Sequence, residues 1–131
     1  MKYLFSTEIP VRDYECDIQG IVNNANYQHY TEHTRHLFLK EKNLSFAALH
    51  EQGIDVVVAR MTLSFKEPFR PDDVIVSCLN CERFGVKYEF THHLYRKNDM
   101  KLCHTSKVTC VCIIDGKLST SEIIDKALLA D

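Results

Sequence analysis

Asp17, Gly20, Asn23 and Asn24 form the part of the sequence best suited to chemistry. Asp17 follows an extended run, Gly20 indicates a turn, and the asparagines are favourable caps for a helix that continues from Tyr27. The first amides of a helix have no partner within it, and this end of the helix attracts negative charge. A carboxylate beside such amides provides a base or nucleophile and donors for an oxyanion. Acyl transfer from a thioester requires both.

The role of Asp17 has two chemical interpretations and one structural interpretation. As a general base the carboxylate activates water, and as a nucleophile it forms a mixed anhydride with the acyl group. An aspartate in this position can also accept hydrogen bonds that stabilise the turn. The sequence leaves the two chemical roles open. Asn23 and Asn24 could hold water or the thioester through their side chains, although helix capping is the expected role.

His29, Glu32 and His33 match the spacing of a zinc-peptidase motif on one face of a helix. The chain is small, and no further acidic ligand is evident in it. We expect Glu32 to pair instead with Arg35 or His36, which lie at helical spacing from it. The sequence therefore predicts no metal site and no cofactor.

The six cysteines include the pairs Cys78/Cys81 and Cys110/Cys112. Both pairs lie in strand-like segments, and a spacing of three sends Cys78 and Cys81 to opposite faces of a strand. We expect buried, reduced thiols rather than zinc ligands.

Composition limits the class of protein. The chain has 131 residues, 45% of them hydrophobic and 26% charged, as expected for one globular domain over residues 1–131. A formal charge of -2 indicates no nucleic-acid partner. No apolar run approaches the roughly 20 residues that span a membrane, and residues 1–3 do not lead into a signal-peptide core. A cytoplasmic location without membrane attachment is the expectation.

Periodicity predicts the elements that position the motif. Alternating apolar residues indicate a strand at about 2–13, and a period of 3.6 indicates a long helix at about 26–42. The expected inner face of that helix carries Tyr27, Tyr30, Thr34, Leu37 and Phe38. Its outer face carries His29, Glu32, His33, His36 and Lys40.

The rest of the chain reads as a short helix followed by strands. We expect that helix at 45–53 and an amphipathic strand at about 57–66, with Val57, Ala59, Met61, Leu63 and Phe65 on one face. Three more strands are expected at about 74–83, 86–97 and 101–114, and Ser119 with Glu122 predicts a capping box for a terminal helix. The predicted fold is α+β, with a five-stranded antiparallel sheet wrapped around one long helix.

Two motifs carry a family resemblance. The first is Asp17-x-x-Gly20-Ile21-Val22-Asn23-Asn24-x-x-Tyr27 followed by Tyr30-x-Glu32-x-x-Arg35, and the second is Phe65-x-x-Pro68-x-x-x-Asp72. Together they resemble the hot-dog-fold acyl-CoA thioesterases, in the branch similar to 4-hydroxybenzoyl-CoA thioesterase. The resemblance covers essentially the whole chain. It implies a small-molecule acyl-CoA substrate and a homodimer or homotetramer, with sheets joined edge to edge and active sites at the subunit interface.

The resemblance also implies roles for single residues. Asp17 corresponds to the catalytic carboxylate, and a backbone N–H around Asn24 corresponds to the group that polarises the carbonyl. Tyr27 is expected to line the substrate site. Arg60 and Thr62 are expected to line it across the dimer, with simple solvent exposure as the alternative for both.

Ile21 stands where some relatives have a histidine, so no histidine in this loop can share the role of Asp17. Hydratases of the same fold use an acid with a nearby histidine, and this absence argues against them. An acyl-CoA thioesterase is the predicted function. The alternatives are an acyl-acyl carrier protein thioesterase and a non-catalytic module that binds acyl thioesters.

Overall fold

The computed structural model describes residues 2–129. A strand, a long helix and a short helix precede a run of strands, and a helix ends the described chain. The elements are β1 (Phe5–Pro10), the 3-10 helix η1 (Asp13–Glu15), α1 (Asn24–Glu41), α2 (Phe46–Glu51), β2 (Ile54–Phe65), β3 (Val74–Phe84), β4 (Lys87–Arg96), β5 (Lys101–Ile114), β6 (Lys117–Ser119) and α3 (Glu122–Leu128).

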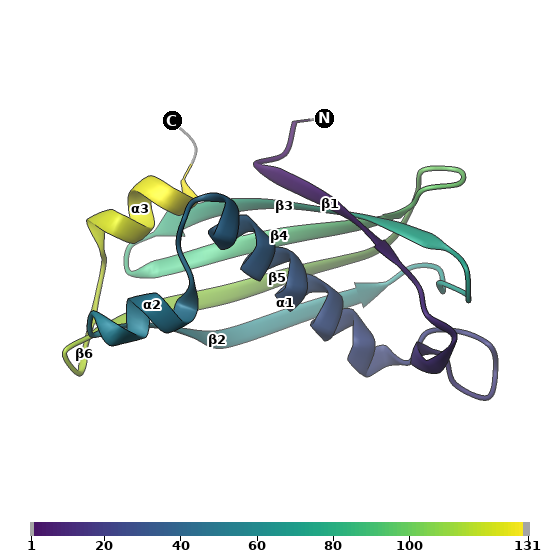
Figure 1. Cartoon of the computed structure of the whole chain (residues 1–131), viewed down its shortest axis with the longest axis horizontal. Coiled ribbons are helices and arrows are strands. Elements are labelled where there is room, and N and C mark those ends of the chain that lie inside the picture. Colours follow the sequence, from purple (N-terminus) through teal and green to yellow (C-terminus); the bar gives the residue numbers. More distant parts are fainter. Residues whose placement is uncertain (1, 130–131) are drawn as a thin grey trace.

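One antiparallel sheet organises the molecule. Its strands follow the order β1-β3-β4-β5-β2, and the three-residue strand β6 pairs with β5. Helix α1 lies across one face of this sheet, with α2 beside the start of β2 (Figure 1). The expected α+β architecture, a sheet wrapped around one long helix, is therefore confirmed. The short β6 is a sixth strand that the sequence pattern did not indicate.

Helix α1 buries a broader face than its periodicity predicts. Tyr27, Tyr30, Thr34 and Phe38 are buried as expected, but Leu37 is only half-buried. Thr31, Arg35 and Leu39 are buried as well, because α1 packs over the sheet along its full length. All five side chains expected on the outer face are exposed.

In the first half of β2, the residues predicted to share a face with Met61, Leu63 and Phe65 are wrong. The pairing of β2 with β5 shifts between Val58 and Arg60, as it does where a β-bulge adds one residue to a strand. Val58 therefore lies opposite Cys110 and shares the inner face with Met61, whereas Val57 turns outward. A single inserted residue reverses the alternation, and simple period-two counting cannot detect it.

The expected cap of the terminal helix is also wrong. Ser119 ends β6, and Ser121 is the N-cap of α3, with its Oγ accepting a hydrogen bond from the N–H of Ile124 at 3.4 Å. The pairing of β6 with β5 keeps Ser119 extended, so the helix begins two residues later.

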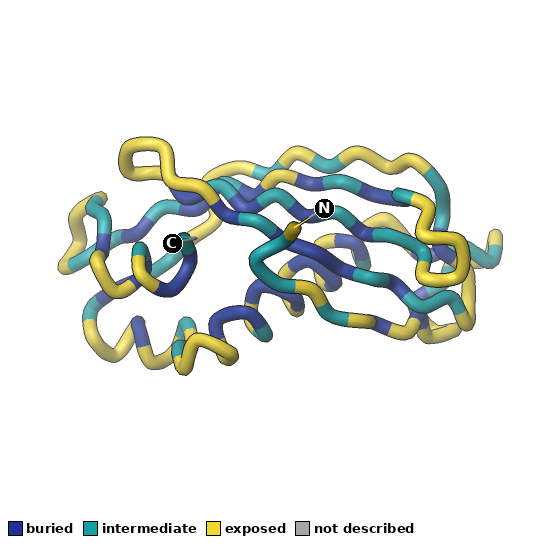
Figure 2. Tube along the Cα trace, turned by 90° about the horizontal axis from the view of Figure 1, so that it is seen from above, coloured by how far each residue is buried: buried dark blue, intermediate teal, exposed yellow. Residues whose placement is uncertain are grey.

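Two apolar clusters fill the space between α1 and the sheet. One contains Phe38, Leu49, Tyr88 and Phe90, and the other, at the N-terminal end of α1, contains Tyr27. Figure 2 shows buried and exposed positions alternating along the strands.

Among the described residues, no helix is both long and apolar enough to cross a membrane.

Candidate active site

A tight loop presents Asp17 just before α1. Cys16 and Val22 form an isolated antiparallel bridge, the N–H of Asp17 donates to the carbonyl of Ile21 at 2.9 Å, and the N–H of Gly20 donates to the carbonyl of Asp17 at 2.9 Å. Gly20 has a φ of 76°, a conformation that favours glycine. The Asp17 side chain is exposed, and its Oδ1 accepts from the N–H of Gln19 at 2.9 Å. The predicted turn is present, and the carboxylate remains accessible.

The first turn of α1 leaves one amide free. Asn23 is the N-cap, with its Oδ1 accepting from the N–H of Ala25 at 3.0 Å and its carbonyl accepting from the N–H of Asn26 at 3.0 Å. Across residues 2–129, no hydrogen-bond acceptor is found for the N–H of Asn24. This amide lies at the positive end of the helix, where it can donate to an oxyanion. Asn23 therefore has the expected capping role.

A buried carboxylate that the sequence analysis missed fixes the loop to the helix. Glu15 is 8% exposed, accepts from Arg12 Nη2 at 2.8 Å through Oε2, and accepts from the Tyr30 hydroxyl at 3.0 Å through Oε1. Its carbonyl accepts from the N–H of Asn23 at 3.0 Å and from Asn26 Nδ2 at 2.8 Å. Burial, followed by the Glu15 hydrogen bond, raises the pKa of Tyr30. The i, i+3 spacing of Arg12 and Glu15 was the only local signal for this network.

The two sequence motifs meet at one cavity of about 240 Å³. One wall comes from the loop and the start of α1, and the other comes from the end of β2 and the turn after it. The lining residues are Ile21, Val22, Asn24, Tyr27, Phe65, Lys66, Glu67 and Pro68. Asp17 is not among them, but the carbonyl of the lining residue Ile21 holds the Asp17 amide. We call this space the loop cavity.

Tyr27 and Phe65 line the loop cavity and pack against the ring of His104, which lies behind them. The Tyr27 ring centroid lies 5.0 Å from that of Phe65 and 4.7 Å from that of His104. His104 is fully buried, and burial lowers its pKa to about 4, so the imidazole is neutral near pH 7. Burial also raises the pKa of Tyr27. An apolar wall of this kind suits the acyl part of a thioester. His104 is distant in sequence from Tyr27, and only the folded chain brings the two rings together.

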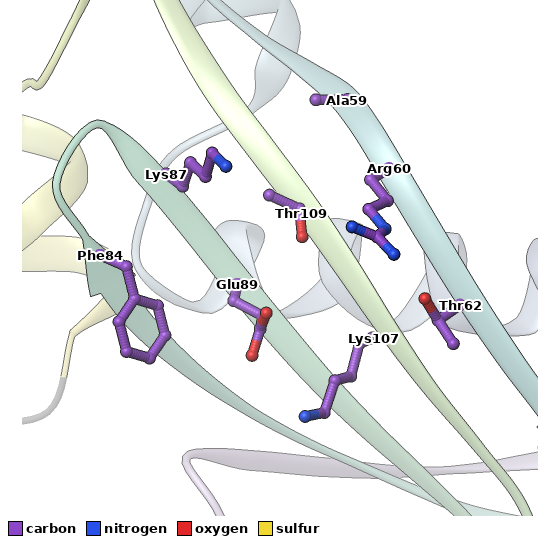
Figure 3. Close-up of a pocket in the computed structure, with 8 residues that line it drawn as sticks. All are labelled: Ala59, Arg60, Thr62, Phe84, Lys87, Glu89, Lys107 and Thr109. Carbon is purple, nitrogen blue, oxygen red and sulfur yellow. The ribbon is translucent and has the colours of Figure 1, made fainter.

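Arg60 and Thr62 lie elsewhere. They point from the outer face of the sheet into a separate pocket of about 560 Å³, shared with Lys87, Lys107 and Thr109 (Figure 3). After the bulge in β2, the side chains of Arg60 and Thr62 project from the face of the sheet opposite α1. Within one chain they do not join the loop cavity, and their role at a partner's site stays a prediction.

The residues considered as metal ligands lie on α1 and in the strands β3 and β5. His29, Glu32 and His33 are exposed on α1, and the described residues contain no group of three His, Cys, Asp or Glu side chains that could hold a metal ion. All six cysteines are free and five are buried. Burial raises the pKa of Cys81 to about 12, so this thiol stays protonated.

The chain is similar to known proteins over most of its length. The profile of the Thioesterase-like superfamily matches residues 11–129. A protein of Aquifex aeolicus (strain VF5), named as a candidate esterase, is 31% identical over 109 residues, which cover 82% of this chain and 84% of that protein. The acyl-CoA thioester hydrolase YbgC of Escherichia coli O6:H1 is 26% identical over 125 residues, covering 93% and 92% of the two chains.

A plant relative is longer than this chain. The chloroplastic acyl-acyl carrier protein thioesterase ATL3 of Arabidopsis thaliana is 36% identical over 97 residues. The match covers 73% of this chain but only 51% of the plant protein, so the chain spans about half of that relative's length.

Solved structures show the same fold. The 1,4-dihydroxy-2-naphthoyl-CoA thioesterase of Synechocystis has a TM-score of 0.89 at 16% identity, covering 95% of this chain and 94% of that chain. A hypothetical protein of Aquifex aeolicus has a TM-score of 0.87 at 26% identity, covering 95% and 98%. The profile match over residues 11–129 spans the Asp17 loop, the start of α1 and the turn after β2. The chain belongs to the Thioesterase-like superfamily.

Proposed function

We propose that the protein hydrolyses acyl-CoA thioesters to a free acid and coenzyme A, with Asp17 and the Asn24 amide at the reacting carbonyl. The observation that supports this proposal is that the exposed Asp17 loop adjoins a cavity lined by Asn24, whose N–H has no acceptor among residues 2–129, and by Tyr27 and Phe65. A carboxylate and an oxyanion donor beside an apolar pocket are the groups that thioester hydrolysis needs. A pure binding module has no use for the carboxylate.

The chemistry follows from these groups. With Asp17 as base, the carboxylate takes a proton from water as the water oxygen attacks the thioester carbon, and the Asn24 N–H donates to the oxyanion. The intermediate then collapses, the C–S bond breaks, and the thiolate of coenzyme A leaves. With Asp17 as nucleophile, its oxygen forms a mixed anhydride as the thiolate leaves, and water then cleaves the anhydride. Both routes use the same two groups.

The direct test is thiol release across a panel of substrates. We expect the purified protein to release free thiol from acyl-CoA thioesters, with rates that depend on the acyl group. An aryl-CoA thioester and an acyl-acyl carrier protein thioester belong in the same panel. Absence of thiol release from every member would overturn the proposed activity.

An acyl-acyl carrier protein thioesterase is the second candidate function. The similarity to the Arabidopsis acyl-acyl carrier protein thioesterase favours it. The discriminating measurement uses one acyl group on both carriers. A kcat/KM that is higher with the carrier protein than with coenzyme A would select this candidate.

The cytoplasmic location is part of the proposal and stays a prediction.

We propose that the protein assembles as a homodimer, or as a homotetramer built from two such dimers, through β2. This strand is at the edge of the sheet, and its Val57 and Val58 side chains are 40% and 48% exposed. An exposed apolar edge strand favours pairing with a second copy. We expect sedimentation at micromolar concentration to give at least twice the 15.2 kDa mass of one chain. A monomeric mass would contradict this assembly.

A further inference from the structure

A second cavity lies between α1 and β2, farther along the helix from the loop cavity. Its volume is about 260 Å³, below the range of roughly 300–1,000 Å³ that holds a whole small ligand. It therefore suits the end of a chain that enters from elsewhere. Four of its seven lining residues are apolar, and the polar ones are the buried Arg35 and the exposed Glu32 and His36. The lining residues are Glu32, Arg35, His36, Phe46, Val56, Val58 and Cys110. We call it the tail cavity.

Arg35 is a buried cation without a compensating anion. The residue is 5% exposed, and within residues 2–129 no carboxylate oxygen lies within 4.0 Å of its guanidinium nitrogens. The expected pairing with Glu32, which is exposed at the cavity mouth, is therefore absent. Burial lowers the pKa of Arg35, which reflects the cost of removing its charge from water.

The hydrogen-bonding and ring neighbours of Arg35 are neutral, and the exposed Glu32 carboxylate acts on its charge only from beyond 4.0 Å. Arg35 Nη1 donates to His92 Nε2 at 3.1 Å, and its guanidinium carbon lies 5.9 Å from the centre of the Phe90 ring. Burial, and then the Arg35 charge, lower the pKa of His92 to about 3, so His92 accepts the hydrogen bond without offsetting the charge. A guanidinium has five N–H donors in a planar fork that matches a carboxylate. Arg35 therefore retains donors and an unpaired charge at the wall of an apolar cavity.

We propose that the tail cavity binds the far end of the substrate's acyl chain and that Arg35 receives a carboxylate on that end. The substrate class is then a long acyl-CoA with a carboxylate-terminated chain, a specificity that rests on the proposed thioesterase function. Phe46, Val56 and Val58 contact the methylene groups, and Arg35 pairs with the terminal carboxylate.

The placement of the two cavities supports a long chain. Both are lined by α1 and β2: the loop cavity by Asn24 and Phe65, and the tail cavity by Arg35 and Val58. Eleven residues separate Asn24 from Arg35, and a helix rises about 1.5 Å per residue, so the two ends of the site lie roughly 16 Å apart along α1. Short acyl groups do not reach Arg35.

The test compares acyl-CoAs of equal chain length that end either in a methyl group or in a carboxylate. In the wild-type protein we expect kcat/KM to be at least about 10-fold higher for the carboxylate series once the chain is long enough, with no such preference for short chains. Arg35→Met should reduce this ratio about 10- to 100-fold, the range for hydrogen bonds to charged groups. Arg35→Lys should retain part of it. His33→Ala, on the exposed side of the same helix, should leave it unchanged.

A ratio measured within one variant is independent of general loss of folded enzyme. An active wild-type protein with no carboxylate preference at any length would overturn this inference and leave the thioesterase proposal standing. Calorimetric binding of a free long-chain carboxylate, compared with the primary alcohol of equal length, needs no hydrolysis. Arg35-dependent preference for the carboxylate in a protein that hydrolyses no thioester would support the tail cavity and reject the thioesterase proposal. Equal binding of the carboxylate and the alcohol would overturn the role of Arg35 even if Arg35→Met did not fold.

Discussion

Replacing Asp17 with asparagine is expected to lower kcat by about 10²–10⁴, the range for loss of a general base, with little change in substrate binding. Asparagine keeps the size of the side chain and the Oδ1 atom that accepts the N–H of Gln19. It removes the oxygen that takes a proton or attacks the carbonyl. The measurements are steady-state hydrolysis, thermal melting, and binding of a non-hydrolysable acyl-CoA analogue.

Asp13→Asn is the matched control for this substitution. Asp13 is an exposed carboxylate four residues earlier, in η1, and has no place in the proposed chemistry. The two variants change the net charge equally, so any difference between them reports on position rather than on charge. Near-normal turnover by well-folded Asp17→Asn would reject the catalytic assignment. A melting-temperature loss with turnover retained would instead identify Asp17 as a turn-stabilising residue.

Replacing Asn24 with proline is expected to lower kcat by about 10²–10³, the cost of losing one oxyanion donor. Proline removes the backbone N–H, and it is well tolerated at the first position of a helix because that N–H has no helical partner. Asn24 is this first residue of α1. The preceding residue, Asn23, has φ -64° and ψ 140°, an extended conformation that a following proline favours. The fold should therefore survive while the donor is lost.

Asn24→Ala separates the backbone donor from the side chain. Alanine keeps the N–H and removes only the amide group, so we expect turnover close to that of the wild type. Circular dichroism and melting should match among the three proteins. Equal loss of kcat in the alanine and proline variants would assign the effect to the side chain. Full activity of the proline variant would place the oxyanion donor elsewhere.

The local parts of the site could be predicted because each depends on residues close in sequence. Gly20 adopts the positive φ that a tight turn requires, and Asn23 caps the helix that follows it. The alternation of apolar residues likewise determines where most strands lie, because side chains on a strand point to opposite faces in turn. These features follow from backbone geometry over a few residues, and the sequence alone determines them.

The tertiary structure decided which residues surround the Asp17 loop and helix α1. The bulge near Ala59 depends on the pairing of β2 with β5, so the placement of Val58 on the face of the sheet toward α1 was not visible in the sequence. Glu15 is buried because it lies between Arg12 and Tyr30, which only the packing of α1 brings together. Burying a charge costs free energy, and only hydrogen-bonding or ionic partners, or a ligand, can offset that cost. The whole fold decides which of these partners lie close to the charge. Glu32 was expected to pair with Arg35 or His36, but among the described residues no carboxylate lies within 4.0 Å of the Arg35 guanidinium. Only the assembled sheet and helix show the cavity beside Arg35.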